Sequence, residues 1–391
     1  MIPSYFEPAI ACCIPTDEAV LPLLSITCQC ASPHVNEALR ERLDLHPLVA
    51  SCWQPQSLCL CFHPRRPGRA VVHSMHLSAM DVTTFARDHI PQITATAGLV
   101  SYALLRNKLT TGGIFAGILV AFIHMLHPWP AFFWLLILFF LFGTFVTKIG
   151  HSAKAHLTQS STGGSGGEGA RSSAQVFANS GTACVLLSLH AWLLNCTPFT
   201  SSNMRIAPGP QFPVLEKVLP IGIIAQYAAV AADTFSSELG ILSKTQPFLI
   251  TAPWKQVPRG TNGGVTVEGL MYGALGSFLL TLTAILALWL APPNTIVDVR
   301  AAALLSVMGL NGSIIDSILG AVVQATVTDK GTGRVVEGSG GQRVQIVAGG
   351  SRTQMGWDLL TNNGVNFAMA ALTSVFAMGI AWAGEISLFG K

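Results

Sequence analysis

The stretch Ala231-Ala-Asp233-Thr234-Phe-Ser236-Ser237-Glu238-Leu-Gly240 follows directly on the apolar run Leu219–Ala232. It places two carboxylates at the end of a segment apolar enough to enter a membrane. A charge inside a bilayer costs about 2.5–3.5 kcal/mol on insertion scales, so a spanning segment that keeps one usually has a functional reason. The stretch therefore indicates a membrane protein with a polar site near one face.

The composition is typical of the membrane class. Half of the 391 residues are hydrophobic, 10% are charged and the mean hydropathy is +0.52. About a quarter of the residues of a soluble protein are charged, so these values argue against a soluble protein. The net charge of +3 is small and scattered along the chain, which argues against a nucleic-acid partner.

Apolar segments follow one another closely beyond residue 88. Each is judged against the roughly 20 apolar residues that cross a bilayer. They predict an all-α polytopic membrane protein, a bundle of about eight transmembrane helices with polar loops on the cytosolic face. The predicted spans are 90–105, 112–128, 130–147, 174–195, 215–236, 265–291, 300–326 and 364–384.

Two parts of the chain differ in composition. Residues 1–88 carry several prolines, the basic run Arg65-Arg66-Pro-Gly-Arg69 and no sustained apolar period, so we expect a weakly structured N-terminal extension. Residues 89–391 form the predicted integral membrane domain. Within it, Asp329–Arg352 alternates Gly and Val with polar residues, which predicts a loop or hairpin insert at 327–360.

Basic residues sort the predicted loops into two faces. Beyond residue 90, twelve Lys and Arg fall on one face and four on the other, and the positive-inside rule makes the first face cytosolic or its organellar equivalent. An endomembrane, such as the ER, and an organellar membrane both remain open. The twelve are Arg106, Lys108, Lys148, Lys154, Arg171, Lys244, Lys255, Arg259, Lys330, Arg334, Arg343 and Arg352, and the four are Arg205, Lys217, Arg300 and Lys391.

Two acids inside apolar segments are candidate magnesium ligands. On a helix, Asp233 and Glu238 are about 140° apart, so they cannot share a narrow face unless the helix breaks, whereas Asp233 and Ser237 can. Asp316 lies inside the seventh predicted span. Magnesium is usually held by one or two carboxylates plus phosphate oxygens, which favours Asp233 and Asp316 as the metal site. A helix end whose acids are solvated is the alternative.

A basic glycine loop precedes the sixth predicted span. Lys255 and Arg259 supply charge, while the glycines let the backbone approach a phosphate. The spacing is not that of a Walker loop, and a glycine-rich turn with incidental charge is the alternative. The candidate phosphate-binding residues of the loop are Gly260, Thr261, Asn262, Gly263 and Gly264.

Polar residues also open two further predicted spans. Arg171 precedes a helix start, where unpaired backbone N–H groups favour an anion, and Asn179 lies two turns further on. Asn363 and Asn366 open the last span. Ordinary capping and hydrogen bonds between helices are the alternative for these residues, and the local pattern favours it for the Arg171–Asn179 segment.

These motifs together resemble the transmembrane protein 19 family, the integral membrane domain of unknown function 92. The resemblance covers about residues 100–385. This sequence departs from the family pattern in its long N-terminus and in Ser236. Five motifs carry it: Ala174-Gln-Val-Phe-Ala-Asn179-Ser-Gly181, Ala232-Asp233-Thr-Phe-Ser-Ser-Glu238-Leu-Gly240, Val257-Pro-Arg-Gly260-Thr-Asn-Gly263-Gly264-Val-Thr, Gly312-Ser-Ile-Ile-Asp316-Ser-Ile-Leu-Gly320-Ala and Asn362-Asn363-Gly-Val-Asn366.

The resemblance implies an activity as well as a fold. One branch of the family is the plant phytyl-phosphate kinase, which uses a nucleoside triphosphate to make phytyl diphosphate, and CTP-dependent polyprenol and diacylglycerol kinases are similar more loosely. The resemblance thus implies a membrane-embedded isoprenoid-monophosphate kinase. Carried over, its site comprises Asp233, Glu238, Lys255, Arg259, Gly260, Gly263, Gly264 and Asp316, with Asn179, Asn363 and Asn366 behind them.

Three hypotheses about function follow from the sequence. The first is a phosphotransferase in which Asp233 and Asp316 hold Mg²⁺, Lys255 and Arg259 are catalytic, and a nucleoside triphosphate phosphorylates a membrane lipid or isoprenoid phosphate. Arg171, Ser237 and Glu238 are further candidates for substrate or phosphate binding. The second is a cation- or proton-coupled transporter that uses the same acids. The third is a structural membrane protein without catalysis, and the oligomeric state is open in all three.

Overall fold

The computed structural model describes residues 82–161, 169–196 and 212–389. The predicted N-terminal extension falls outside these residues except for 82–88, which contain α2 (Val82–Asp88). Contacts divide the chain into two units. The first includes α2, and the second, Pro91–Ala191 with Val214–Lys391, holds the helical bundle.

Helices at all eight predicted spans make up this bundle. Six are long and apolar enough to cross a membrane, while α3 and α4 are shorter apolar helices. With 16 and 15 residues, these two reach roughly 24 Å, less than the roughly 30 Å of a hydrocarbon core. The eight helices are α3 (Ile90–Leu105), α4 (Thr111–Met125), α5 (Ala131–Lys148), α7 (Ser173–Cys196), α8 (Pro213–Gly240), α9 (Val267–Leu290), α10 (Val299–Val323) and α11 (Asn362–Ala383). A short helix, α6 (His151–Lys154), follows α5.

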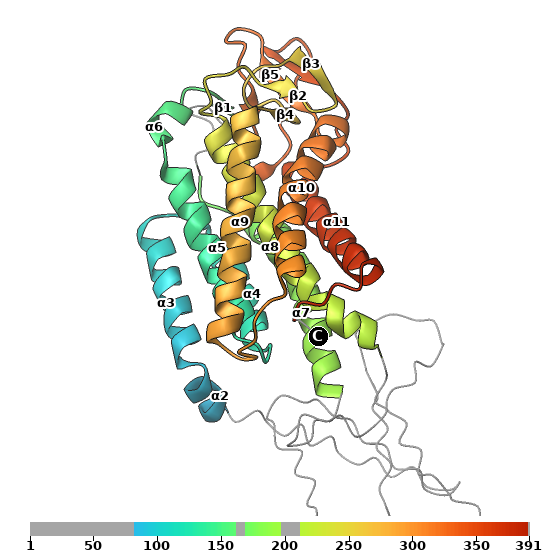
Figure 1. The fold of residues 1–391 in the computed structure, drawn as a ribbon. Coiled ribbons are helices and arrows are strands. Elements are labelled where there is room, and N and C mark those ends of the chain that lie inside the picture. Colours follow the sequence, from blue (N-terminus) through green and yellow to red (C-terminus); the bar gives the residue numbers. More distant parts are fainter. Residues whose placement is uncertain (1–81, 162–168, 197–211, 390–391) are drawn as a thin grey trace, which may run out of the picture. The chain divides into compact units, whose positions relative to one another are not determined.

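Connecting segments at one end of the bundle carry the strands (Figure 1). We call the described residues of 106–110, 149–172, 241–266 and 324–361 the polar end. The twelve cationic residues predicted for one face belong to these segments or, in the case of Lys148, to the helix terminus beside them. We call the turns 126–130 and 291–298, which join helices at the other end, together with the segment 384–389 that follows α11, the aromatic end.

Three small sheets tie the loops of the polar end together. β1 (Gln159–Ser160) pairs in parallel with β6 (Val336–Glu337), and β5 (Thr326–Asp329) pairs antiparallel with β7 (Arg352–Met355). The third sheet has the order β3-β2-β4 and is antiparallel. Its strands are β2 (Phe248–Leu249), β3 (Ala252–Gln256) and β4 (Gly264–Val265).

Helix α8 forms the core of the bundle. Every residue from Val218 to Ala232 is buried, as expected of a helix that is apolar all round. Small residues let its neighbours approach closely. A side chain added at Gly276 of α9 would meet the Ala231 carbonyl at 2.8 Å, and one at Gly312 of α10 would meet Ala229. These glycines place α9 and α10 directly against α8.

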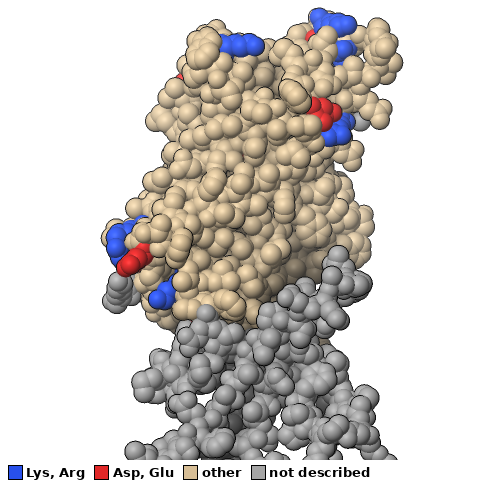
Figure 2. All heavy atoms as spheres, turned by 90° about the vertical axis from the view of Figure 1, so that its right-hand side faces the viewer, with Lys and Arg blue, Asp and Glu red and all other residues tan. Residues whose placement is uncertain are grey.

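The outer surface of the bundle is suited to lipid. Large apolar side chains such as Phe115, Phe145, Leu286 and Phe376 are exposed on helices from around the bundle. On the face shown in Figure 2, a band without charged side chains separates two charged levels. The chain is an all-α polytopic membrane protein, as its sequence predicts.

Candidate functional site

The two acids of α8 face different neighbours. The helix continues unbroken to Gly240, so Asp233 and Glu238 project from different sides of it, as the sequence predicts. The Asp233 carboxyl contacts that of Asp316 on α10. Ser237, one turn after Asp233, is exposed and donates its hydroxyl to the Asp233 backbone carbonyl at 2.8 Å. Asp233 therefore belongs to a pair of acids between α8 and α10.

This pair is incompletely satisfied. Oδ1 of Asp316 is buried and has no hydrogen-bond partner among the described residues. An unpartnered buried carboxylate oxygen is costly, and two carboxylates in contact repel one another when both are ionised. A proton or a cation between them would relieve both effects.

Glu238 is held in an ion pair instead. Its Oε2 accepts from Nζ of Lys154 at 2.7 Å and its Oε1 accepts from the Thr147 hydroxyl at 3.1 Å. Lys154 also donates to the Thr147 carbonyl at 2.9 Å. These contacts fasten the end of α8 to α5 and α6, and they occupy both carboxylate oxygens.

The glycine loop lies against α10, one turn beyond Asp316. Gly263 has φ of +75°, and a side chain there would meet the Ser317 carbonyl at 2.7 Å and the Ala321 side chain. The backbone nitrogen of Gly263 also lies beside Gly320, which shares a helix face with Asp316 because the two are four residues apart. Glycine is therefore required at 263, both for its φ and for this close approach.

The remaining loop residues hold the loop in place. Asn262 donates its backbone N–H to the Thr326 hydroxyl and its side-chain amide to the Ala325 carbonyl. Gly260 has φ of +82° and packs against Thr158, and Gly264 begins β4. Oγ1 of Thr261 is buried without a hydrogen-bond partner among the described residues.

The two cations predicted for this loop lie in different surroundings. Arg259 donates through Nη1 to the Ile241 carbonyl at 2.9 Å and through Nη2 to the carbonyls of Lys244 and Thr245. It therefore fixes the turn after α8. Lys255 is exposed on β3, and its side chain forms no hydrogen bond or ion pair with the described residues.

Arg171 lies at the junction of α4, α5 and α7. Its backbone pairs with the segment before α4, receiving from Thr110 N–H at 3.0 Å and donating to the Lys108 carbonyl at 2.9 Å. Its guanidinium packs beside Gly143 of α5. Burial lowers the pKa of this guanidinium and the charge of Glu238 raises it, and an arginine stays charged under both influences.

Amide side chains join α7 to α8 and α11. The Asn179 side-chain oxygen accepts from Asn366 at 3.5 Å, and its backbone carbonyl accepts from Gln226, a buried amide in the middle of α8. Asn363 donates to the Gly340 carbonyl at 2.9 Å. The structure thus gives the asparagines contacts between helices and loops, in line with the capping and packing interpretation.

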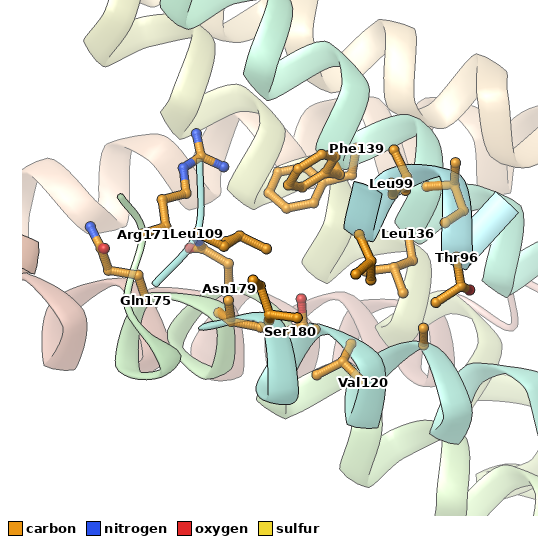
Figure 3. A pocket seen from close by; sticks show the side chains of 17 residues that line it. Thr96, Leu99, Leu109, Val120, Leu136, Phe139, Arg171, Gln175, Asn179 and Ser180 are labelled. Carbon is orange, nitrogen blue, oxygen red and sulfur yellow. The ribbon is translucent and has the colours of Figure 1, made fainter. Parts of the chain in front are cut away.

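A cavity of about 100 Å³ lies between α3, α4, α5 and α7. Figure 3 shows Arg171, Gln175 and Asn179 at one end of its lining and Thr96, Leu99 and Leu136 at the other. Most of the lining is apolar. The cavity therefore has one polar, cationic end and a long apolar side.

Sequence reasoning missed several partners of these residues. Lys154, which binds Glu238, looked like one loop cation among twelve, and Thr147 carries no local signal. Gln226 could have been found, because an amide inside the apolar run 219–232 is unusual. Among the described residues no group of three or more His, Cys, Asp or Glu is placed to hold a metal, so a metal here would rely on the carboxylate pair.

The sequence comparisons are consistent with this geometry. The family model described as integral membrane protein DUF92 matches residues 94–374. The chain belongs to this family. Every predicted site residue, from Arg171 to Asn366, lies inside the matched range. The predicted family membership is thereby confirmed.

Three relatives show how widely the likeness extends. Protein PGR of Arabidopsis thaliana is 37% identical over 69% of this chain and 88% of its own length. Protein VTE6, chloroplastic, of the same plant is 27% identical over 58% of this chain and 61% of its own length. An uncharacterized membrane protein of Methanocaldococcus jannaschii is 38% identical over 27% of this chain and 40% of its own length. No solved structure matches the chain.

Proposed function

We propose that this protein is a membrane-embedded kinase of isoprenoid monophosphates. The carboxyl pair Asp233 and Asp316 carries the proposal, because two acids in contact, one with a buried and unpartnered oxygen, are prepared for a ligand. Their position at the base of a glycine loop further supports a phosphate substrate. The motif resemblance to phytyl-phosphate kinase supplies the substrate class.

The reaction transfers the terminal phosphoryl group of a nucleoside triphosphate. A phosphate oxygen of the isoprenoid monophosphate forms a bond to the γ-phosphorus while the bond from that phosphorus to the β–γ bridging oxygen breaks. The products are the isoprenoid diphosphate and a nucleoside diphosphate. The attacking phosphate is already anionic, so no strong base is needed, and positioning and electrostatics dominate the rate.

The donor set of the acid pair fits Mg²⁺. The ion prefers oxygen ligands and is usually bound by one or two carboxylates together with substrate phosphates, so Asp233 and Asp316 would hold it and the unpartnered Asp316 Oδ1 would gain a ligand. When bound, the ion would neutralise charge on the donor phosphates.

The chain's own residues would position the phosphates. The loop around Gly263 brings backbone to the same face of α10 as Asp316, where a donor phosphate could approach without meeting a side chain. Lys255 is exposed and free to meet donor charge, whereas Arg259 supports the loop through carbonyls. Glu238 would act through its ion pair with Lys154, holding α8 in place.

The partners follow from this chemistry. The acceptor is a lipid of the surrounding bilayer and the donor is a water-soluble nucleotide that arrives at the polar end. An endomembrane or an organellar membrane would supply such lipids. No feature of the described residues favours a nucleic acid.

The test is a transfer assay with purified protein in detergent. Phytyl, geranylgeranyl and farnesyl monophosphates are each incubated with Mg²⁺ and each labelled nucleoside triphosphate, and diphosphate product is measured. We expect product with at least one acceptor, and none after addition of EDTA. Absence of product from every combination with the folded wild-type protein would contradict the proposal.

A transport assay distinguishes the kinase from the chief alternative, a cation- or proton-coupled transporter. In proteoliposomes, uptake of protons, Na⁺ or K⁺ that Asp316→Asn abolishes would support a transporter that uses the same acids. The kinase proposal expects equal ion uptake by wild type and variant.

A further inference from the structure

The cavity between α3, α4, α5 and α7 is distinct in position from the acid pair between α8 and α10. Its polar end is formed by Arg171, with Gln175 and Asn179 beside it. Beyond them the lining is mostly apolar and includes Leu99, Val120 and other side chains of α3, α4 and α5, with Thr96 at the far end. One cation at the end of an apolar cavity is complementary to an anionic amphiphile.

Arg171 is available to an anion. Its hydrogen bonds to the described residues use only its backbone, and no carboxylate among these residues forms an ion pair with its guanidinium. Most of the side chain is surrounded by protein, while part stays accessible along the cavity. A partly desolvated guanidinium binds phosphate through two parallel N–H groups more strongly than an exposed one does.

We propose that this cavity binds the isoprenoid monophosphate acceptor, with its phosphate on Arg171 and its first isoprene unit against α3, α4 and α5. This inference rests on the proposed function for the identity of the lipid. It adds where the lipid lies and which part of it the protein recognises.

The size of the cavity limits what it recognises. An apolar cavity of about 150 Å³ binds one benzene ring, and the cavity here is about 100 Å³. It therefore has room for about one five-carbon unit. The rest of the tail would lie in the bilayer, beyond α3, which buries only Gln92 and Ala103. Affinity should then depend on the phosphate and the first unit, and little on total chain length.

Gly117 on α4 offers a way to fill the cavity. It is part of the lining, and a side chain added there would have only Leu109 Cδ1 nearby, at 4.0 Å. Gly117→Leu should therefore fold and occupy the space proposed for the first isoprene unit. Gly379→Leu on α11 is the matched control, because Gly379 has no atom within 4 Å of an added side chain and lies outside the cavity. Both changes raise helix propensity.

The experiment measures equilibrium binding of radiolabelled farnesyl monophosphate to the full chain in nanodiscs, without nucleotide or Mg²⁺. We expect Gly117→Leu to weaken binding at least tenfold and Gly379→Leu to leave it unchanged. Geranylgeranyl monophosphate should bind within threefold of the farnesyl compound, and inorganic phosphate at least a hundredfold more weakly.

The phosphate contact has its own readout. Arg171→Gln should weaken binding of farnesyl monophosphate at least tenfold while leaving the weaker binding of farnesol unchanged, and Arg171→Lys should restore part of the loss. Equal loss of both ligands would show a role in structure alone and overturn the contact.

The failures of the two proposals are distinguishable. If Gly117→Leu binds farnesyl monophosphate as tightly as wild type, or if wild type does not bind it, the cavity is not the acceptor site, whatever the transfer assay shows. If the binding results are as expected but no nucleotide supports transfer, the kinase proposal fails and the binding site stands.

Discussion

His127 at the aromatic end and Asp316 near the polar end show two opposite situations of a polar side chain inside the bundle. At the aromatic end, His127 accepts the backbone N–H of Trp129 at Nδ1 and bonds through Nε2 to Nδ1 of His190, each at 2.9 Å. Near the polar end, Asp316 keeps a buried oxygen without a partner among the described residues. Satisfied polar groups hold helices together, whereas an unsatisfied one carries a cost that a ligand can remove.

The hydrogen bonds at the aromatic end also fix the protons of the histidines. Because the Trp129 N–H donates to Nδ1 of His127, the proton of that ring is on Nε2, which donates to His190. The ring also packs edge-on against Phe132. Every nitrogen of His127 is thus used within the fold, and no capacity remains for a substrate.

The largest expected effect is on catalysis at the acid pair. Asp316→Asn should lower kcat of the transfer reaction by roughly 10²–10³-fold, the size found when one preorganised electrostatic group is removed from an active site. The thermal midpoint should not fall, because the variant replaces the carboxyl that faces Asp233 with a neutral amide of similar size. Kinetics and thermal unfolding of the purified variant measure both.

A matched control is Asp329→Asn, the same change on an exposed turn of the polar end. It should keep the wild-type kcat. If Asp316→Asn keeps the wild-type kcat, the acid pair does not take part in the reaction.

The next effect is on stability at the aromatic end. His127→Ala should lower the free energy of unfolding by about 2–4 kcal/mol, since it empties buried space and leaves His190 Nδ1 unpartnered. The kcat per folded molecule should stay unchanged. Thermal unfolding and active-site titration measure the two quantities, and the exposed His151→Ala is the control. A loss of kcat without a loss of stability would contradict the contrast between the ends.

A smaller effect concerns Glu238, the acid of α8 that has a partner. A double-mutant cycle of Lys154→Met and Glu238→Gln should give a coupling of about 1 kcal/mol, near the upper end of values for exposed pairs, because the side chains are 12% and 27% exposed. Chemical unfolding of the four proteins measures it. If Glu238→Gln lowers kcat as strongly as Asp316→Asn does, Glu238 binds substrate rather than supporting α8.

The smallest effect is a pH dependence on the surface of the polar end. Oδ1 of Asp329 accepts the backbone N–H groups of Gly331 and Thr332, and these bonds lower the pKa of the carboxyl below its usual 3.8. A lowered pKa contributes stability above pH 3.8, and this contribution is lost as the pH falls through the folded-state pKa. The difference in thermal midpoint between wild type and Asp329→Asn should therefore shrink between pH 6 and pH 3. A difference in thermal midpoint that does not change with pH would contradict this prediction.

Sequence patterns could predict the helices because the signal is local. Each span follows from a run of apolar residues, and the eight predicted positions coincide with eight helices. The separation of Asp233 from Glu238 also follows from helical periodicity alone. The alternating segment after Asp329 predicted a hairpin insert, and β5 and β7 pair antiparallel around it.

Sequence patterns could not predict the partners of charged groups, because these depend on packing between distant segments. Glu238 binds Lys154, 84 residues earlier, and His127 binds His190, 63 residues later. Arg259 and Arg171 are the same residue type at the same end, yet one donates to three carbonyls and the other lines a cavity. The cavity itself requires side chains of four helices, so no single motif contains it.

The parallel pair of β1 and β6 also bears on how this protein is made. Gln159 pairs with Val336, so the loop after α6 finds its strand partner only when most of the chain has been synthesised. Such non-local contacts form late in folding, because a long loop must close first. During membrane insertion, the helices up to α10 would already be in place while the polar end was still open. The pairing of β1 with β6 would therefore form only after the helices up to α10 had been inserted.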